Sequence, residues 1–533
     1  MKLFRKTALA SAVAVMATGL ASLPAQAAVG ASWADTATRT IDLTGLQSLG
    51  ALSNGTLLTV NINLALQHRD ELDAYVAEVR RPGSPAYGQF LTPAEFSARY
   101  SPSPQSVQRV SDYLRAAGFT NLSVSANRTI ISAVGSAAVI RSAFNTEIAQ
   151  FKLGDRTAFA NTRPVRVPAS LSGIVLSVVG LQTVHQAHLS QANSSATATS
   201  YQPTQLAKAY GADSLSPATS ESVGVLLWGS PDNAISNLND YAASNGYGTV
   251  NLQTVEPGAT SRATADGTLE WSMDTQTILG VTGGVASMTL FVGASNSDSD
   301  LETVMNDVVT QQSGYVRNIN NSWDGCERTA HSTGFMAAVD QILEQASSQG
   351  QVFFFSTGDS GSNGCSSRVA AVGYPSSSPY AVAVGGTSLY TNSDGSYSSE
   401  SAWSGGGGGI SSFEAAPSWQ SAALGNSMRE VPDIAFDGDP ATGVTLSVHG
   451  HALQGSGGTS LSSPIAVALW TRLNANMGAL GFPGAFFYDV LPSSVFHDVT
   501  TGSNGAYSAG PGYDLTTGQG SMDISAVLGF FTN

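Results

Sequence analysis

The chain has 533 residues, of which 42% are hydrophobic and only 11% are charged, and its formal net charge is −15. A disordered chain would combine few apolar residues with dense charge, and a nucleic-acid-binding protein would be rich in Lys and Arg, so both classes are disfavoured. At roughly 150 residues per domain, the length predicts two to four domains.

The charge is unevenly spread along the chain. Residues 28–199 contain 13 Lys or Arg and 10 Asp or Glu, a net charge of +3, whereas residues 200–533 contain 7 and 28, a net charge of −21. Carboxylates that protonate in acid lower the self-repulsion of such a segment. The second part therefore has either an ordinary solvated acidic surface or an adaptation to low pH.

Residues 1–27 have the features of an export signal. Three cations, an apolar stretch and a small-residue cleavage site follow one another: Lys2, Arg5, Lys6, 8–20 and Ala25-Gln26-Ala27. Nothing downstream approaches the roughly 18 continuous apolar residues of a membrane span. We expect a secreted protein, extracellular or periplasmic, with no membrane partner. In that oxidising setting Cys326 and Cys365 favour one disulfide over a metal pair.

Residues 28–189 form a predicted α/β unit without any constellation of catalytic residues. Apolar spacing predicts one helix that stops before Pro82 and another that ends at Gly118, and Thr92-Pro93-Ala94-Glu95 is a capping box. Strand-like runs lie at 57–63 and 129–134.

Residues 190–200 are poor in large apolar side chains, which predicts an exposed, cleavable linker. From residue 201 onward, short apolar strands alternate with helical stretches. The strands are expected at 223–228, 288–292, 316–321, 352–355 and 381–384, and helices at 268–279 and 339–347. This alternation predicts a parallel sheet with helices on both faces.

The most specific motif is Gly457-Gly458-Thr459-Ser460, which continues through Ser463-Pro464 into the apolar stretch 465–473. Glycine lets the backbone approach a substrate closely. A serine at the start of a helix exposes its hydroxyl, and its N–H has no partner within the helix. The pattern suits a nucleophile whose own N–H binds an oxyanion, or alternatively a plain helix N-cap.

A nucleophilic serine needs a base, but none of the seven histidines lies in the histidine-glycine-threonine context that subtilisins use. Glu270 and Asp274 instead stand four residues apart on one helical face. Two carboxyl groups this close cannot both ionise cheaply, so one of them is pushed toward holding a proton. We expect Glu270 to accept the Ser460 proton and Asp274 to orient it; the alternative is a solvated acidic face.

A third acid, Asp359, follows the strand 352–355 within Ser356-Thr357-Gly358-Asp359. Ligands bind at the carboxyl ends of strands in a parallel sheet. An aspartic acid held there in its protonated form can donate a hydrogen bond to an oxyanion, whereas the alternative is an Asx turn. The glycine-rich run 404–409 either lines a peptide-binding cleft or is a plain surface loop.

Taken together and in this order, the three motifs resemble the sedolisin family of serine-carboxyl peptidases, and its bacterial pseudomonalisin-like members most. The resemblance covers nearly all of the chain after the export signal and implies a subtilisin-like fold. It assigns Ser460 as the nucleophile, Glu270 as the general base and acid, Asp274 as its partner and Asp359 as the oxyanion donor. Accessory matches are Tyr374-Pro375, 384–387 and Val431-Pro432-Asp433.

The resemblance also gives the first unit a role. Its motifs at 81–87 and 91–96 are similar to those of the family's activation propeptides, which fold as ferredoxin-like α/β modules and inhibit the enzyme intramolecularly. The expected organisation is a signal peptide at 1–27, a propeptide at 28–189, a processing region at 190–200 and a catalytic domain at 201–533. We expect a monomer that hydrolyses protein substrates at acidic pH through an acyl-enzyme.

A metal site is expected near the C-terminus. By spacing alone, Asp498 and Asp514 with the glycine-rich turn between them offer hard oxygen ligands that suit Ca²⁺ rather than Zn²⁺, or they form an ordinary turn. The resemblance implies one structural Ca²⁺, held by these two side chains and by the carbonyls of Val499, Gly510 and Gly512.

Two competing functions remain open. A subtilisin-type peptidase with a Ser-His-Asp triad, active at neutral pH, would need His331, His449 or His451 beside the nucleophile. A catalytically inactive, secreted binding protein is disfavoured because all four proposed active-site residues are present. His449-Gly450-His451 supplies at most half of a zinc site, and spacing places no third ligand.

Overall fold

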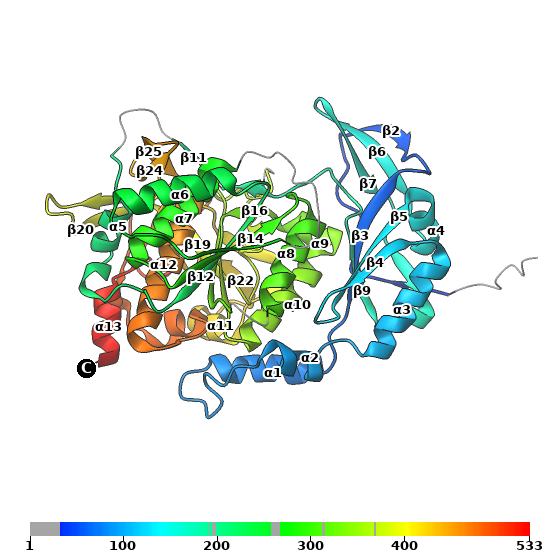
Figure 1. Ribbon diagram of the computed structural model, residues 1–533, viewed down its shortest axis with the longest axis horizontal. Coiled ribbons are helices and arrows are strands. Elements are labelled where there is room, and N and C mark those ends of the chain that lie inside the picture. Colours follow the sequence, from blue (N-terminus) through cyan, green and yellow to red (C-terminus); the bar gives the residue numbers. More distant parts are fainter. Residues whose placement is uncertain are drawn as a thin grey trace, which may run out of the picture.

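Two α/β units make up the molecule. The smaller, N-terminal unit lies on one side of a larger unit that is built around a central sheet (Figure 1). The computed structural model describes residues 32–190, 192–193 (backbone only), 199–256, 267–311, 315–366 and 369–532. The export signal expected at 1–27 lies outside the described residues. No helix in the described ranges is long and apolar enough to cross a membrane.

An eight-stranded sheet forms the centre of the larger unit, in the order β13-β14-β12-β15-β17-β19-β20, with β23 also paired to β19. All pairs are parallel except β19 with β20. The strands are β12 (Ser222–Trp228), β13 (Leu252–Val255), β14 (Ser287–Gly293), β15 (Asn318–Asn321), β17 (Val352–Ser356), β19 (Val382–Thr391), β20 (Tyr397–Ala402) and β23 (Ile434–Asp437).

Helices cover both faces of this sheet, which confirms the predicted architecture (Figure 1). On one face α7 (Thr268–Thr282) and α12 (Thr459–Met477) pack side by side, and on the other lie α8 (Asp298–Thr310) and α10 (Phe335–Ser348). α7 and α12 are buried on nearly all sides, although both carry polar residues. A helix buried all round is normally apolar, so these polar residues mark a site inside the protein.

The first unit has its own apolar core under an antiparallel sheet of order β4-β5-β3-β9. Its elements are β2 (Gln47–Ala51), β3 (Leu57–Leu64), α1 (Arg69–Arg80), α2 (Pro93–Arg99), α3 (Pro104–Ala117), β4 (Thr120–Val124), β5 (Ile130–Ser136), α4 (Ala137–Ala143), β6 (Ile148–Leu153), β7 (Arg156–Asn161) and β9 (Val175–Val179). The capping box at Thr92 and the end of α3 at Gly118, where φ is 100°, are confirmed.

The first unit contacts the larger unit along the helices α8 and α10 of the larger unit. Asn61 of β3 donates to the Ser299 carbonyl at 2.9 Å, and Arg69 of α1 pairs with Glu344 at 3.1 Å. Beyond α1, the Tyr87 hydroxyl donates to the carbonyl of Leu480 at 2.8 Å. The first unit is therefore docked through polar contacts that are specific to this pairing.

Shorter elements complete the chain. They are β1 (Trp33–Asp35), β8 (Arg166–Pro168), η1 (Ala169–Leu171), β10 (His188–Leu189), β11 (Ala192–Asn193), α5 (Pro203–Ala209), η2 (Ala212–Ser214), α6 (Asp232–Ser244), β16 (Trp323–Cys326), α9 (Glu327–Thr333), β18 (Gly373–Tyr374), β21 (Gly409–Ala415), α11 (Ser418–Leu424), β22 (Met428–Val431), β24 (Val444–Val448), β25 (His451–Gly457), η3 (Phe486–Val490), η4 (Ser493–Val495), β26 (Phe496–His497), β27 (Ser521–Met522) and α13 (Ile524–Thr532).

The expected exposed linker differs from the structure at its first residue. Ser190 is only 1% exposed, and the backbone of Ala192–Asn193 forms a strand pair with β25. Composition predicted exposure because the segment lacks large apolar side chains. Its backbone hydrogen-bonding groups, which composition does not report, pair instead with strands of the larger unit.

Candidate active site

The acidic pair lies at the start of α7. Glu270 and Asp274, one helical turn apart, are both fully buried. The Ser322 hydroxyl donates to Asp274 Oδ1 at 2.6 Å, and Asn320 donates to the Ser322 hydroxyl oxygen at 3.1 Å. The alternative of a solvated acidic face is therefore wrong for this pair.

Burial is the largest cause of the raised pKa values of both acids. It raises the pKa of Asp274 to about 8, and together with the adjacent Asp274 charge it raises the pKa of Glu270 well above its ordinary value. The hydroxyls of Ser460 and Ser322 face Glu270 and oppose this rise, although neither closes a hydrogen bond of full geometry. Contacts of this kind tighten only when substrate is bound. Both carboxyl groups therefore hold their protons to higher pH than free carboxyl groups do.

Ser460 is the second residue of α12 and is fully buried. Its hydroxyl donates to the Ser322 carbonyl at 3.2 Å, and its N–H donates to the Ser190 carbonyl at 3.0 Å. Gly458, at φ 107°, turns the chain from β25 into the helix, a conformation that only glycine adopts without strain. This turn aims the N–H groups of the first helical residues at the site, where those of Thr459 and Ser460 donate to the Asp359 carboxyl and to the Ser190 carbonyl.

Pro464 affects Ser460 from one turn further along α12. Proline has no N–H to donate to the carbonyl four residues before it, which here is the carbonyl of Ser460. The Ser322 hydroxyl lies 3.4 Å from that carbonyl and 2.6 Å from Asp274. Ser322 thus contacts both the acidic pair and the nucleophile's backbone.

Asp359 follows the end of β17 and reaches the first turn of α12. Its Oδ1 accepts from the N–H of Thr459 at 2.8 Å and from the Thr459 hydroxyl at 2.9 Å. Its Oδ2 is buried and has no hydrogen-bond partner within the described part of the chain. Burial, with a smaller effect from the charge of Asp324, raises the pKa of Asp359 to about 7. In acid this carboxyl is therefore a hydrogen-bond donor beside the N–H of Ser460.

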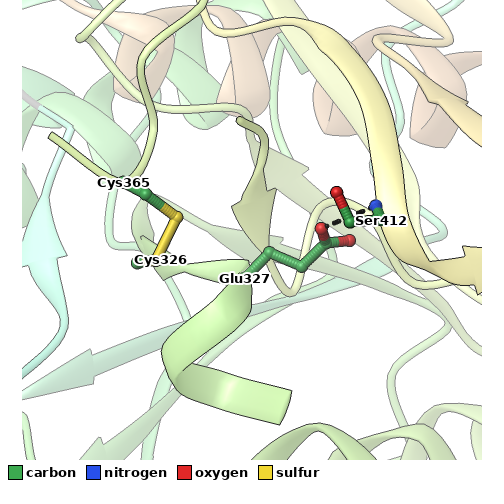
Figure 2. The surroundings of a disulfide bond; sticks show 4 residues. All are labelled: Cys326, Glu327, Cys365 and Ser412. Atoms are coloured by element: carbon green, nitrogen blue, oxygen red, sulfur yellow. Dashed lines mark hydrogen bonds between the residues drawn. A yellow bond between two sulfur atoms is a disulfide. The ribbon is translucent and has the colours of Figure 1, made fainter. Parts of the chain in front are cut away.

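A disulfide stabilises the loop that carries Asp359. Cys326 at the end of β16 is joined to Cys365, so the expected pairing is confirmed (Figure 2). The neighbouring Glu327 accepts from the Ser412 N–H at 3.0 Å and from the Ser411 hydroxyl. The Asp359 loop, β16 and β21 are thereby connected.

Within the run 404–409, the glycines at 406–409 are buried, whereas Ser404 at its start is exposed. The Gly407 N–H donates to the Gly358 carbonyl at 2.8 Å, and a Cβ at Gly407 would lie 1.9 Å from the Thr357 carbonyl oxygen. Any side chain at this position would displace the loop that leads into Asp359. The plain-surface-loop alternative is therefore wrong for 406–409.

Sequence reasoning missed four residues of the site: Asn320, Ser322, Asp324 and Thr459. A signal existed for the first two. β15 is a fully buried strand that reads Asn-Ile-Asn-Asn and is followed by a buried serine. Amides in a central strand need polar partners, so such a run indicates a buried polar network.

The histidines needed by a subtilisin-type triad lie elsewhere. His331 on α9 stacks on the ring of Phe413, with centroids 4.2 Å apart, and His449 occupies the turn between β24 and β25. Among the described residues no hydrogen bond or ion pair joins a histidine to Ser460, and no group of three His, Cys, Asp or Glu side chains is placed to hold a metal ion.

The two aspartates of the expected calcium site meet on one loop. Asp498 accepts from the Gly512 N–H at 3.0 Å, and Asp514 Oδ2 accepts from the Gly510 N–H at 3.0 Å. Val499 is buried. The two carboxylates lie in the loop between β26 and β27 and bond to neighbouring glycines of that loop, and this oxygen-only donor set fits a hard cation once backbone carbonyls complete it.

Comparisons with known proteins cover both units. A family model described as "Pro-kumamolisin, activation domain" matches residues 44–184, and one described as "Subtilase family" matches residues 228–478. The gap between these matches, residues 185–227, contains β10, β11, α5 and most of β12.

Individual relatives match over most of the chain. Sedolisin of Pseudomonas sp. (strain 101) is 36% identical over 97% of this chain and 96% of its own length. Xanthomonalisin of Xanthomonas sp. (strain T-22) is 35% identical over 88% of this chain and 64% of its own length. A solved structure of Pseudomonas sedolisin, a serine-carboxyl proteinase complexed with two molecules of pseudo-iodotyrostatin, aligns with a TM-score of 0.60 and 37% identity, covering 63% of this chain and 99% of that one.

Proposed function

The chain belongs to the sedolisin family of serine-carboxyl peptidases and carries an activation domain, and from that premise we propose that it is an acid-acting endopeptidase whose active site is Ser460, Glu270, Asp274 and Asp359. One observation carries the proposal: buried carboxyl groups lie at the first turn of α12, where Glu270 interacts with the Ser460 hydroxyl and Asp359 accepts from the N–H of Thr459, and within the described residues no hydrogen bond joins an imidazole to Ser460.

In the proposed reaction, the Ser460 hydroxyl oxygen adds to the carbonyl carbon of the scissile peptide bond. Glu270 takes the hydroxyl proton, and the neighbouring Asp274 carboxyl shares that proton with Glu270. The oxyanion accepts hydrogen bonds from the N–H of Ser460 and from the protonated Oδ2 of Asp359.

The intermediate then collapses. The carbon–nitrogen bond breaks, and Glu270 gives its proton to the leaving amine. Water adds to the acyl-enzyme with Glu270 again as base, which releases the new carboxyl terminus and returns the proton to Ser460. The overall change is hydrolysis of one peptide bond, with no net proton taken up by the site.

Acid dependence follows from the two kinds of carboxyl group. Asp359 donates only when protonated, and its pKa is raised to about 7 by burial. Glu270 accepts a proton only when ionised. The active form therefore combines a protonated Asp359 with an ionised Glu270, a state that disappears as the pH rises through the pKa of Asp359.

Replacement of Ser460 by alanine tests this function. We expect S460A to lose all measurable casein hydrolysis at pH 4 while keeping the helix content of the active protein. S462A is the matched control, because the Ser462 hydroxyl donates to the Phe436 carbonyl at 3.0 Å and faces away from the acids. Full activity in S460A would rule out the proposed nucleophile.

We propose in addition that one structural Ca²⁺ binds at Asp498 and Asp514, completed by the carbonyls of Val499, Gly510 and Gly512. Such an ion would neutralise two carboxylates that share one turn. We expect about one calcium per chain in metal analysis of dialysed protein, and less calcium with a lower melting temperature in D514N. Calcium-free protein with an unchanged melting temperature after chelation would contradict the assignment.

The cellular setting and domain limits complete the proposal. The cations and apolar stretch of residues 1–27 support export to the periplasm or the medium. We assign 28–189 to the inhibitory propeptide, 190–200 to the processing region and 201–533 to the catalytic domain of a monomer. Mass spectrometry of secreted protein tests these limits.

A further inference from the structure

Two short strands, β10 before Ser190 and β11 after it, lie beside the candidate nucleophile. β10 pairs antiparallel with β16, with Leu189 opposite Trp323, and β11 pairs antiparallel with β25, the strand that leads into Ser460. The segment on either side of Ser190 is therefore held by strand pairing on both sides of the nucleophile. An extended peptide added to strand edges is a recurring way of binding peptides.

Ser190 itself lies opposite the nucleophile. Its carbonyl accepts from the N–H of Ser460 at 3.0 Å, and its own N–H donates to the Ser322 carbonyl at 3.3 Å. The Ser460 hydroxyl donates to that same Ser322 carbonyl at 3.2 Å. The N–H group assigned to the oxyanion is thus already bound to one particular carbonyl of the chain, that of Ser190.

Side chains of the segment are contacted as well. Asp324 Oδ1 lies 3.0 Å from the Ser190 hydroxyl and 3.1 Å from Nε2 of His188. Residues two apart on a strand point to the same face, so one buried carboxyl meets both side chains. This double contact fixes the register of the segment, because a slip by one residue would turn both side chains away from Asp324.

We propose that the first processing cut breaks the peptide bond on the carboxyl side of Ser190. The inference rests on the proposed role of Ser460 and narrows the processing region 190–200 to its first bond. The Ser460 oxygen forms a bond to the Ser190 carbonyl carbon as its proton passes to Glu270. The carbon–nitrogen bond then breaks, the new amine takes the proton, and water hydrolyses the Ser190 ester to a free carboxyl group.

The experiment uses the full-length zymogen, purified at neutral pH and shifted to pH 4. Intact mass and N-terminal sequencing of the earliest products identify the first cut, while casein hydrolysis is followed in parallel. We expect a first fragment that ends at Ser190 and a partner that begins at residue 191. Because Ser190 contacts the nucleophile of its own chain, the rate constant of the first cut is expected to be independent of zymogen concentration.

Two variants at one position separate backbone register from side-chain contact. S190P removes the N–H that donates to Ser322, and we expect cleavage at this bond to slow at least about tenfold. S190A keeps every backbone contact and loses only the hydroxyl contact with Asp324, so its first cut stays at the same bond and slows by about fivefold or less. S190A keeps the test valid if S190P fails to fold.

Each outcome decides the question. Casein hydrolysis with an earliest cut at another bond, for example beside Tyr201, overturns the processing site and leaves the peptidase function standing. Absence of all Ser460-dependent cleavage, of casein and of the zymogen alike, overturns both. An earliest cut after Ser190 that S190P suppresses and S190A retains supports the proposal.

Discussion

Burial contributes more to the raised pKa of Glu270 than the charge of its neighbour Asp274 does. For both acids burial is the largest cause of the raised pKa, and for Glu270 the charge of Asp274 comes second. Their spacing was visible in the sequence, and so was the helix start at Ser460. The contacts of Ser322 were not, because Ser322 lies between β15 and β16, 48 residues from Asp274 and 138 from Ser460.

Ser322 is therefore a positioning residue whose removal has a defined effect. Its hydroxyl lowers the pKa of both Glu270 and Asp274, so S322A raises both pKa values. Because Glu270 acts as a base only when ionised, the acidic limb of the pH–rate profile is expected to move to higher pH. The maximal rate is expected to fall by about tenfold, the equivalent of one charged hydrogen bond.

The pH–rate profile of S322A against S462A checks this assignment. If Ser322 had only a structural role, its replacement would lower the amount of folded enzyme without moving the acidic limb of the pH–rate profile. An acidic limb in S322A that coincides with that of S462A would therefore remove Ser322 from the proposed mechanism.

At the scale of elements, the site is assembled from α7, α12 and the loop after β17. The sequence predicted each of these elements from apolar runs and turn signals, and the structure places them as expected on one parallel sheet. It did not predict that β10 and β11 pair with β16 and β25 of the larger unit, since strand pairing between distant segments leaves no local pattern. Nor did it predict that 404–409 packs beneath the Asp359 loop.

The disulfide is expected to stabilise this assembly. It closes a loop of 39 residues, for which the loss of unfolded-state entropy predicts a contribution of about 4 kcal/mol to the free energy of unfolding. The C326S/C365S variant should unfold at a lower denaturant concentration than oxidised wild-type protein. Wild-type protein in reductant should show the same lowered midpoint as the variant. Identical midpoints for the variant and the oxidised wild type would show that the bridge contributes nothing to stability.

At the scale of the whole molecule, the surface between the two units contains buried acids. Glu302 accepts from Asn61 of the first unit at 3.4 Å, and Asp298 accepts from Gln182 at 3.1 Å. Burial raises the pKa of Glu302 to about 8 and that of Asp298 to about 6. The sequence showed the acidity of residues 200–533 but not which acids are buried, because burial depends on how the two units dock.

These acids predict that the zymogen is more stable in acid than at pH 8. Unfolded carboxyls titrate near ~4, so between that pH and about 8 the unfolded state loses protons that the folded state keeps. Unfolding becomes more favourable as the pH rises through this window. Denaturant unfolding of S460A zymogen should give a free energy lower at pH 8 than at pH 4 by more than about 1.4 kcal/mol, one pKa unit on one group.

E302Q provides the matched variant for this prediction. It carries no ionisable group at the interface position, so we expect it to be more stable than the parent at pH 8 and similar to it at pH 4. Stability that rises from pH 4 to pH 8, or an E302Q variant with the same pH dependence as the parent, would contradict the interpretation.

The protonated carboxyl of Asp359 distinguishes this mechanism most clearly from one that uses histidine. The direct measurement is kcat/KM against pH for the processed enzyme and for D359N, whose amide donates a hydrogen bond at every pH. We expect the wild-type rate to fall as the pH rises through about 7, and D359N to be slower but without that fall. A wild-type rate that instead increases from pH 5 to pH 8, as an imidazole base near ~6.5 requires, would contradict the account.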